Sequence, residues 1–68
     1  MLKDERLKEI ETMLQTNGKV EVGNLCRIFN VTEMTIRRDL NDLVARNLAV
    51  GGHRRARAAP ETNMTQRP

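Results

Sequence analysis

Apolar residues recur at helical spacing near the start of the chain. They stand at positions i, i+3 and i+7 and are Leu7, Ile10 and Leu14. Charged and polar residues fill the positions between them, so one stripe of this segment faces a core. Asp4 is placed to cap the first turn, and Asn17-Gly18 supplies a stop signal. The pattern predicts a helix from Asp4 to Thr16.

A short alternating segment and a second helix are predicted next. Polar and apolar residues alternate from Lys19 to Val22, which indicates a brief strand that needs partners elsewhere. Gly23-Asn24 then precedes a cluster of apolar residues, namely Leu25, Cys26, Ile28 and Phe29. This cluster predicts a helix of about two turns that ends near Asn30. Cys26 is expected to be a small core residue.

The helix that begins at Thr32 is the most strongly specified. The Thr32 hydroxyl can accept a hydrogen bond from the backbone N–H of Thr35, and Glu33 places a negative charge at the positive end of the helix dipole. The apolar positions then recur at i, i+4 and i+7 and are Ile36, Leu40 and Leu43. They predict a helix that continues to about Arg46. Because only about three residues around Val31 separate the two helices, the spacing is that of a helix-turn-helix.

A strand, a tight turn and a returning strand are predicted after this helix. Asn47 can end the helix in a left-handed conformation, and Leu48-Ala49-Val50 is followed by the turn signal Gly51-Gly52. His53 to Arg57 is the returning strand, although its arginines leave it little apolar face and its pairing stays open. Residues 58–68 have no periodicity and are expected to be a disordered tail.

These elements predict a mainly α (α+β) fold of one small domain over residues 3–57. It is a three-helix winged helix-turn-helix, with the helix-turn-helix over about 20–39 and a small β wing over about 47–57. A chain of 68 residues has room for only one domain. Since Phe29 is the only aromatic residue, the core must be mostly aliphatic, which suits short packed helices.

Several classes of function lose support from the residue types. With one cysteine and one histidine the chain alone cannot form a closed zinc site or an internal disulfide. It has no serine and no phosphate-cradling glycine motif, so no enzyme class is favoured and no cofactor is expected. No apolar run exceeds three residues, far short of the roughly 20 that cross a membrane. We therefore expect a cytoplasmic protein without a membrane partner.

The position of the positive charge indicates a polyanionic partner. The net charge is +3, and the excess lies between Glu33 and Arg57. Every basic residue there is an arginine, and they are Arg37, Arg38, Arg46, Arg54, Arg55 and Arg57. The planar guanidinium binds phosphate and guanine edges in bidentate fashion. The alternative is that these arginines only solvate a surface.

The helix from Thr32 to Arg46 has one face free for a partner. If Ile36 and Leu40 point inward, a rotation of about 100° per residue places Met34, Arg38 and Asn41 on the opposite face. Thr35 and Arg37 then lie on its flanks. In a helix-turn-helix the start of the second helix enters the major groove. The candidate DNA-binding residues of this helix and the wing are Thr32, Met34, Thr35, Arg37, Arg38, Asn41, His53, Arg54 and Arg55. Arg38 is the first choice for a base contact.

Several motifs resemble the N-terminal domain of the DeoR family of bacterial transcriptional regulators. They are Val20-Glu-Val, Leu25, Phe29-Asn-Val-Thr and above all Thr35-Ile-Arg-Arg-Asp-Leu followed by Leu43. The resemblance covers about residues 3–50. It implies a winged helix, DNA recognition through the helix that holds Arg37 and Arg38, and repression of bacterial sugar-metabolism genes at the nucleoid. It also implies duplex DNA as the partner, and dimeric regulators of this kind suggest a homodimer on DNA.

The chain departs from the family pattern in two places. The family commonly has an arginine and then His-Gly-Gly-Ala after the recognition helix, whereas this chain has Gly51-Gly52-His53-Arg54-Arg55-Ala56. Family members also carry a long C-terminal domain that binds a phosphorylated sugar, and this chain is expected to lack it. Two other interpretations remain open at this point: a winged helix module that binds proteins, and a truncated remnant without function.

Overall fold

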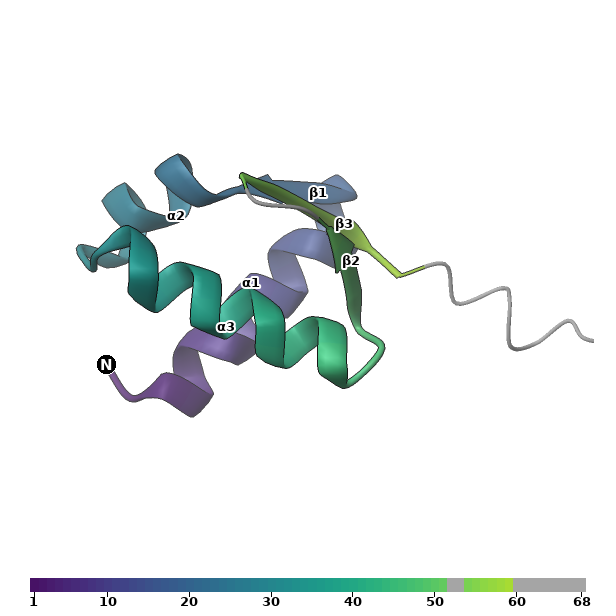
Figure 1. The fold of residues 1–68 in the computed structure, drawn as a ribbon, viewed down its shortest axis with the longest axis horizontal. Helices are drawn as coiled ribbons and strands as arrows, with labels where there is room; N and C mark the ends of the chain where they lie inside the picture. The colour runs from purple at the N-terminus through teal and green to yellow at the C-terminus, as the bar shows by residue number, and fades with distance from the viewer. Residues whose placement is uncertain (52–53, 60–68) are drawn as a thin grey trace, which may run out of the picture.

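The computed structural model describes residues 1–51 and 54–59 of the chain. Within these residues, helices and strands follow one another in the order α1, β1, α2, α3, β2, β3 (Figure 1). Their bounds are Lys3–Asn17 for α1, Lys19–Glu21 for β1, Val22–Phe29 for α2, Glu33–Ala45 for α3, Ala49–Gly51 for β2 and Arg55–Ala58 for β3. The sheet is antiparallel and closes one end of the helical layer. This arrangement confirms the predicted mainly α winged helix-turn-helix.

Helix α1 begins earlier than the sequence predicted. The N-cap position is Leu2 rather than Asp4, because the Glu5 carboxylate accepts a hydrogen bond from the Leu2 N–H at 3.3 Å and draws Lys3 and Asp4 into the first turn. Asp4 therefore complements the helix dipole from inside the helix. The predicted stop is confirmed at Gly18, which has a φ of 86° and donates its N–H to the Leu14 carbonyl at 2.7 Å.

Helix α2 also begins earlier, at Val22 rather than after Gly23-Asn24. The Val22 N–H donates to the carbonyl of Arg54 at 2.8 Å, and the Val22 side chain is buried, so this residue leaves β1 and starts the helix. The helix ends at Phe29, and its C-cap residue Asn30 adopts a left-handed conformation with a φ of 56°. Cys26 is half-buried against the core. Ile28, which belongs to the same predicted apolar cluster as Cys26, is 56% exposed.

Helix α3 has the cap and the buried face that the sequence predicted. The Thr32 side chain accepts a hydrogen bond from the Thr35 N–H at 3.3 Å. The helix ends at Ala45, and Asn47 follows with a φ of 63° in the left-handed region. The three predicted core positions, Ile36, Leu40 and Leu43, are buried.

The returning strand is the centre of the sheet. Strand β3 pairs with β2 to make the wing hairpin and with β1 on its other side, so the strand order is β1-β3-β2. It is described from Arg55 and extends past the expected domain boundary to Ala58. The predicted start of the strand, His53, lies outside the described residues. Ala56 points into the core and is 1% exposed. The apolar face of this strand is therefore made of alanine between arginines, which explains why its pairing was hard to predict.

The core joins all three helices to the sheet. It consists of Leu7, Ile10, Leu14, Val20, Val22, Leu25, Ile36, Leu40, Leu43, Ala49 and Ala56. Strands β1 and β3 pack against α1, and β2 packs against α3. Since each of the described helices and strands contributes to this one cluster, its burial fixes how α3 lies on the rest of the domain.

A buried ion pair joins α1 to α3. The Arg6 guanidinium donates from Nη2 to Oδ1 of Asp39 at 3.2 Å, and its Nε donates to Oδ2 of the same carboxylate. Asp39 is 1% exposed and the Arg6 side chain 11%. The hydrogen bond to Asp39 raises the pKa of Arg6, an effect that outweighs the opposing effect of burial. The bidentate geometry satisfies both partners, so it restricts the rotation of α3 against α1.

A second, exposed ion pair lies nearby on the same two helices. Lys3 Nζ lies 2.8 Å from Oδ2 of Asp42. The hydrogen bond from Lys3 lowers the pKa of Asp42, so this pair stabilises the fold above the unfolded pKa of the carboxyl and is lost as the pH falls through the folded pKa. Both side chains are substantially exposed, so water and salt screen the pair.

We expect Asp39→Asn to destabilise the domain strongly. The substitution leaves the Arg6 charge buried without a counter-charge, which costs about 3 kcal/mol of unfolding free energy. Asp42→Asn is the matched control, since it makes the same chemical change at an exposed pair on the same helix, and its effect should be much smaller. Urea denaturation followed by circular dichroism measures both. Equal losses for the two variants would contradict a structural role for the buried pair.

We expect Gly51→Ala to disturb the wing. A Cβ at Gly51 would lie 2.6 Å from the Arg55 carbonyl oxygen and 2.7 Å from Ala56 Cα, so β2 and β3 would have to move apart. The expected loss of unfolding free energy is about 1–3 kcal/mol. In Gly23→Ala the new Cβ meets nothing within 4 Å on α2, and that control should gain up to about 1 kcal/mol from helix propensity. Thermal unfolding of both variants checks the contrast, and a stable Gly51→Ala would refute the close approach.

Candidate nucleic-acid interface

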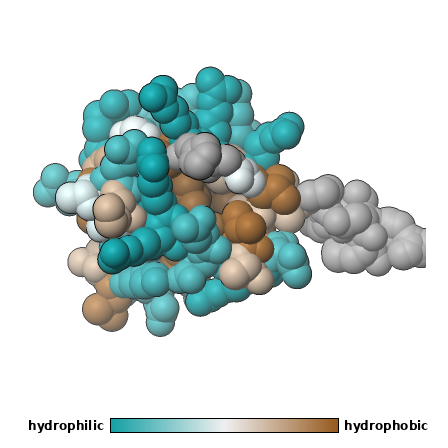
Figure 2. Space-filling model, in the orientation of Figure 1, coloured by the Kyte–Doolittle hydropathy of each residue, from teal (hydrophilic) through white to brown (hydrophobic). Residues whose placement is uncertain are grey.

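The outer face of α3 carries the residues that the helical wheel placed there. Met34 is 60% exposed, and Arg38 and Asn41 are also exposed, while Ile36 on the opposite side is 0% exposed. The view from the side of α3 shows a mainly hydrophilic surface (Figure 2). Burial of one face of α3 therefore leaves Met34, Arg38 and Asn41 on the other face open to solvent.

Two threonines lie at the start of this face. Thr32 precedes the helix and is exposed, and Thr35 is half-buried in the first turn. Their hydroxyl oxygens lie 3.1 Å apart, in addition to the capping hydrogen bond from the Thr35 N–H. Both hydroxyls are thus held in place by the cap and lie at the positive end of the helix dipole.

Arg37 and Arg38 differ in their partners. Arg37 donates from Nη2 to Oε2 of Glu33 at 3.3 Å, one helical turn away, and the two side chains are 46% and 60% exposed. This is a surface pair of the i,i+4 kind and stabilises the helix by only about 0.3–0.5 kcal/mol. In the part of the chain that the structure describes, Arg38 has no carboxylate within ion-pair distance. Neither arginine is locked in an internal ion pair.

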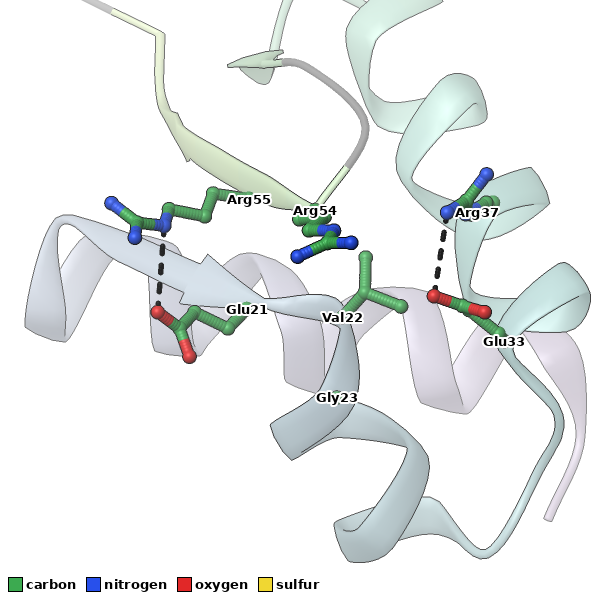
Figure 3. Close-up of a pocket in the computed structure, with 7 residues that line it drawn as sticks. All are labelled: Glu21, Val22, Gly23, Glu33, Arg37, Arg54 and Arg55. Carbon is green, nitrogen blue, oxygen red and sulfur yellow. Dashed lines mark hydrogen bonds and ion pairs between the residues drawn. The ribbon is translucent and has the colours of Figure 1, made fainter.

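An open pocket of about 480 Å³ lies where α2 begins, beside α3 and the start of β3. We call it the arginine pocket, and it is lined by Glu21, Val22, Gly23, Glu33, Arg37, Arg54 and Arg55 (Figure 3). In the close-up, Arg54 and Val22 lie between two ion pairs, one on the side of α3 and one on the side of β1. The hydrogen bond from the Val22 N–H to the Arg54 carbonyl joins the start of α2 to the residue that precedes β3.

The second ion pair of the pocket depends on the register of the sheet. Glu21 is directly opposite Arg55 in the antiparallel pairing of β1 and β3. Arg55 Nε lies 3.5 Å from Oε2 of Glu21, and the side chains are 68% and 54% exposed. A salt bridge this exposed contributes little stability, but it places a carboxylate beside a wing arginine.

The structure brings together some of the predicted site residues and separates others. Arg37, Arg54 and Arg55 share the arginine pocket, whereas Met34, Arg38 and Asn41 lie along the outer face of α3. The predicted site residue His53 lies outside the described residues.

Two acidic residues of this surface, Glu21 and Glu33, were not among the predicted site residues. The i,i+4 spacing of Glu33 and Arg37 was a visible signal for one of them. The other pair could not be found without the register of β1 on β3.

The described residues do not form a metal site, since no group of three or more His, Cys, Asp or Glu side chains gathers among them. Over the same residues, no helix is long and apolar enough to span a bilayer. What the arrangement offers chemically is hydrogen-bond donors and positive charge on a convex helix and an adjacent pocket. Those properties suit an acceptor-rich anionic surface.

The comparisons with known proteins agree with this interpretation. A family model for the DeoR-like helix-turn-helix domain matches residues 6–62. The HTH-type transcriptional regulator IolR of Bacillus subtilis (strain 168) is 42% identical to the chain over 38 residues, which cover 56% of this chain and 15% of the relative. The chain therefore corresponds to a small part of that relative's length. A comparison with solved structures gave no significant match.

The family match covers the whole helix-turn-helix and the wing. It includes α2, the turn, α3 and the β2–β3 hairpin, whose geometry is that of a winged helix. The chain belongs to the DeoR-like helix-turn-helix family of DNA-binding transcription regulators.

Proposed function

We propose that this chain binds double-stranded DNA sequence-specifically, with α3 in the major groove. The observation that carries the proposal is the rotation of α3, which buries Ile36 and Leu40 and exposes Arg38 and Asn41 along one line. A B-DNA major groove about 12 Å wide admits a single α-helix. The exposed line is the part of α3 that would face the base edges.

The exposed residues of α3 have side chains suited to different bases. Arg38 would donate to O6 and N7 of guanine, and Asn41 would pair with N6 and N7 of adenine. Met34 would contact a thymine methyl group. Thr32 and Thr35, at the helix N-terminus, would bind the backbone or a base edge.

The wing side of the arginine pocket would bind the phosphate backbone. Arg54 and Arg55 lie beside α3, where the sugar–phosphate strand passes when a helix occupies the groove. His53 is proposed as a further wing contact to phosphate. These contacts would fix register and supply affinity without reading sequence.

The wider role is proposed from the family. The chain would be the DNA-binding part of a bacterial repressor of sugar-metabolism genes, acting in the cytoplasm at the nucleoid. Its relative from Bacillus subtilis is named a transcriptional regulator. A single small domain gains little affinity from one half-site, so a homodimer on two half-sites is proposed as the bound form.

Fluorescence anisotropy with labelled duplexes tests the function. Affinity should fall as salt rises, with a log–log slope of about −2 if Arg54 and Arg55 each neutralise a phosphate. Duplexes selected from a random pool should bind more tightly than the pool itself. Salt-insensitive or absent binding would favour the alternative that the winged helix docks a protein.

Arg38→Ala should weaken binding to a selected duplex by about 5- to 150-fold, because it removes a bidentate base contact worth about 1–3 kcal/mol. The loss should be largest for duplexes that retain the preferred base pair. Lys8→Ala removes one positive charge from the exposed surface of α1 and serves as the control, with little expected change. Equal losses for the two variants would mean that Arg38 acts only through net charge.

A further inference from the structure

Glu33 stands where a carboxylate should weaken DNA binding. It is 60% exposed, lines the arginine pocket and lies on the first turn of the helix proposed to enter the groove. DNA presents closely spaced negative phosphates, and a carboxylate among the protein's phosphate-binding groups opposes their approach. The interaction of its carboxylate with the positive end of the helix dipole stabilises the helix only slightly.

The contact of Glu33 with Arg37 suggests what the carboxylate does. The pair at 3.3 Å occupies one Nη2 donor and leaves the other guanidinium donors available. A phosphate that approached Arg37 would meet the full negative charge of Glu33, whereas the neutral O6 and N7 acceptors of a guanine would not. The pair therefore penalises a phosphate contact more than a base contact.

The pair also limits where Arg37 can reach. An unpaired arginine on an exposed helix samples many rotamers and loses that freedom when it binds. The hydrogen bond to Glu33 holds the guanidinium along the axis of α3, one turn back toward its start. Arg38, with no such carboxylate partner among the described residues, lacks this restraint.

We propose that Glu33 is a specificity-determining residue that acts through Arg37: its carboxylate positions the guanidinium for a base edge and suppresses binding of Arg37 to phosphate. The inference rests on the proposed function, since it presupposes that α3 faces duplex DNA. It makes Glu33 a positioning residue, and it predicts that the carboxylate costs affinity for random DNA while preserving selectivity.

The experiment compares Glu33→Gln with the wild-type chain on a random duplex and on a selected duplex at several salt concentrations. The variant should bind the random duplex about fivefold more tightly, with a log–log salt slope steeper by about one, because Arg37 gains a phosphate. Affinity for the selected duplex should change little, so the ratio of selected to random binding should fall about fivefold. Glu9→Gln on the exposed surface of α1 is the control for net charge and should keep the wild-type ratio and slope.

A double-variant cycle tests whether Glu33 acts through Arg37. In an Arg37→Gln background, Glu33→Gln should no longer increase affinity for the random duplex or steepen the slope. An equal gain in both backgrounds would overturn the proposal, because the carboxylate would then repel DNA by itself. A loss of affinity limited to one base pair would also overturn it, because Glu33 would then read a base directly.

Folding and function are separated by two further measurements. Thermal unfolding followed by circular dichroism reports the folded fraction of each variant. Affinity measurements on the single variant Arg37→Gln should show a larger loss for the selected duplex than for the random duplex, and this result does not depend on the outcome for Glu33→Gln. A wild-type chain that does not bind DNA would overturn the proposed function and this inference with it. Steep salt dependence in the wild type, with Glu33→Gln identical to Glu9→Gln, would overturn the inference alone.

Discussion

The rotation of α3 about its own axis is the constraint on which the rest of this structure depends. Two different contacts set it: Ile36, Leu40 and Leu43 are buried in the common core, and Asp39 is held by Arg6 of α1. The apolar contacts alone would tolerate small rotations, because hydrophobic burial has no direction. The bidentate ion pair is directional, so it selects one orientation. Arg38, the next residue to Asp39, is thereby turned away from the core.

The same helix shows how charge can be divided between stability and binding. Its buried carboxylate, Asp39, is paired with Arg6 of α1, and one of its exposed carboxylates, Glu33, is paired with Arg37 on the surface. The Arg6–Asp39 pair affects the stability of the fold, since both charges are withdrawn from water and loss of either partner would leave the other uncompensated. The Glu33–Arg37 pair contributes little to stability. It lines the arginine pocket together with Arg54, so it lies where it can affect the binding of a polyanion. A matching arrangement at the wing, Glu21 with Arg55, places acidic and basic side chains together on both sides of the pocket.

Local signals in the sequence were sufficient for the number and order of the described helices and for the outer face of α3. The Thr32 cap, the left-handed Asn47 and the period of Ile36, Leu40 and Leu43 depend on neighbouring residues, and all were predicted. Helix starts were displaced because Glu5 and the Arg54 carbonyl bind N–H groups that sequence alone cannot pair. The central place of β3 could not be predicted, since alanine gives a weak apolar signal and the partner β1 lies more than thirty residues away. The pairing of Arg6 with Asp39 was missed for the same reason of distance along the chain.

The most direct test of this account is an amide NMR titration of the labelled chain with a selected DNA duplex. The account predicts the largest shifts at Met34, Arg38 and Asn41, smaller shifts at Arg54 and Arg55, and little change along the exposed side of α1. An intact Arg6–Asp39 contact should persist through the titration, because DNA would meet α3 without turning it. Shifts concentrated on α1, or a change in the environment of Ile36 and Leu40, would contradict the claim that the outer face of α3 is the DNA-binding surface.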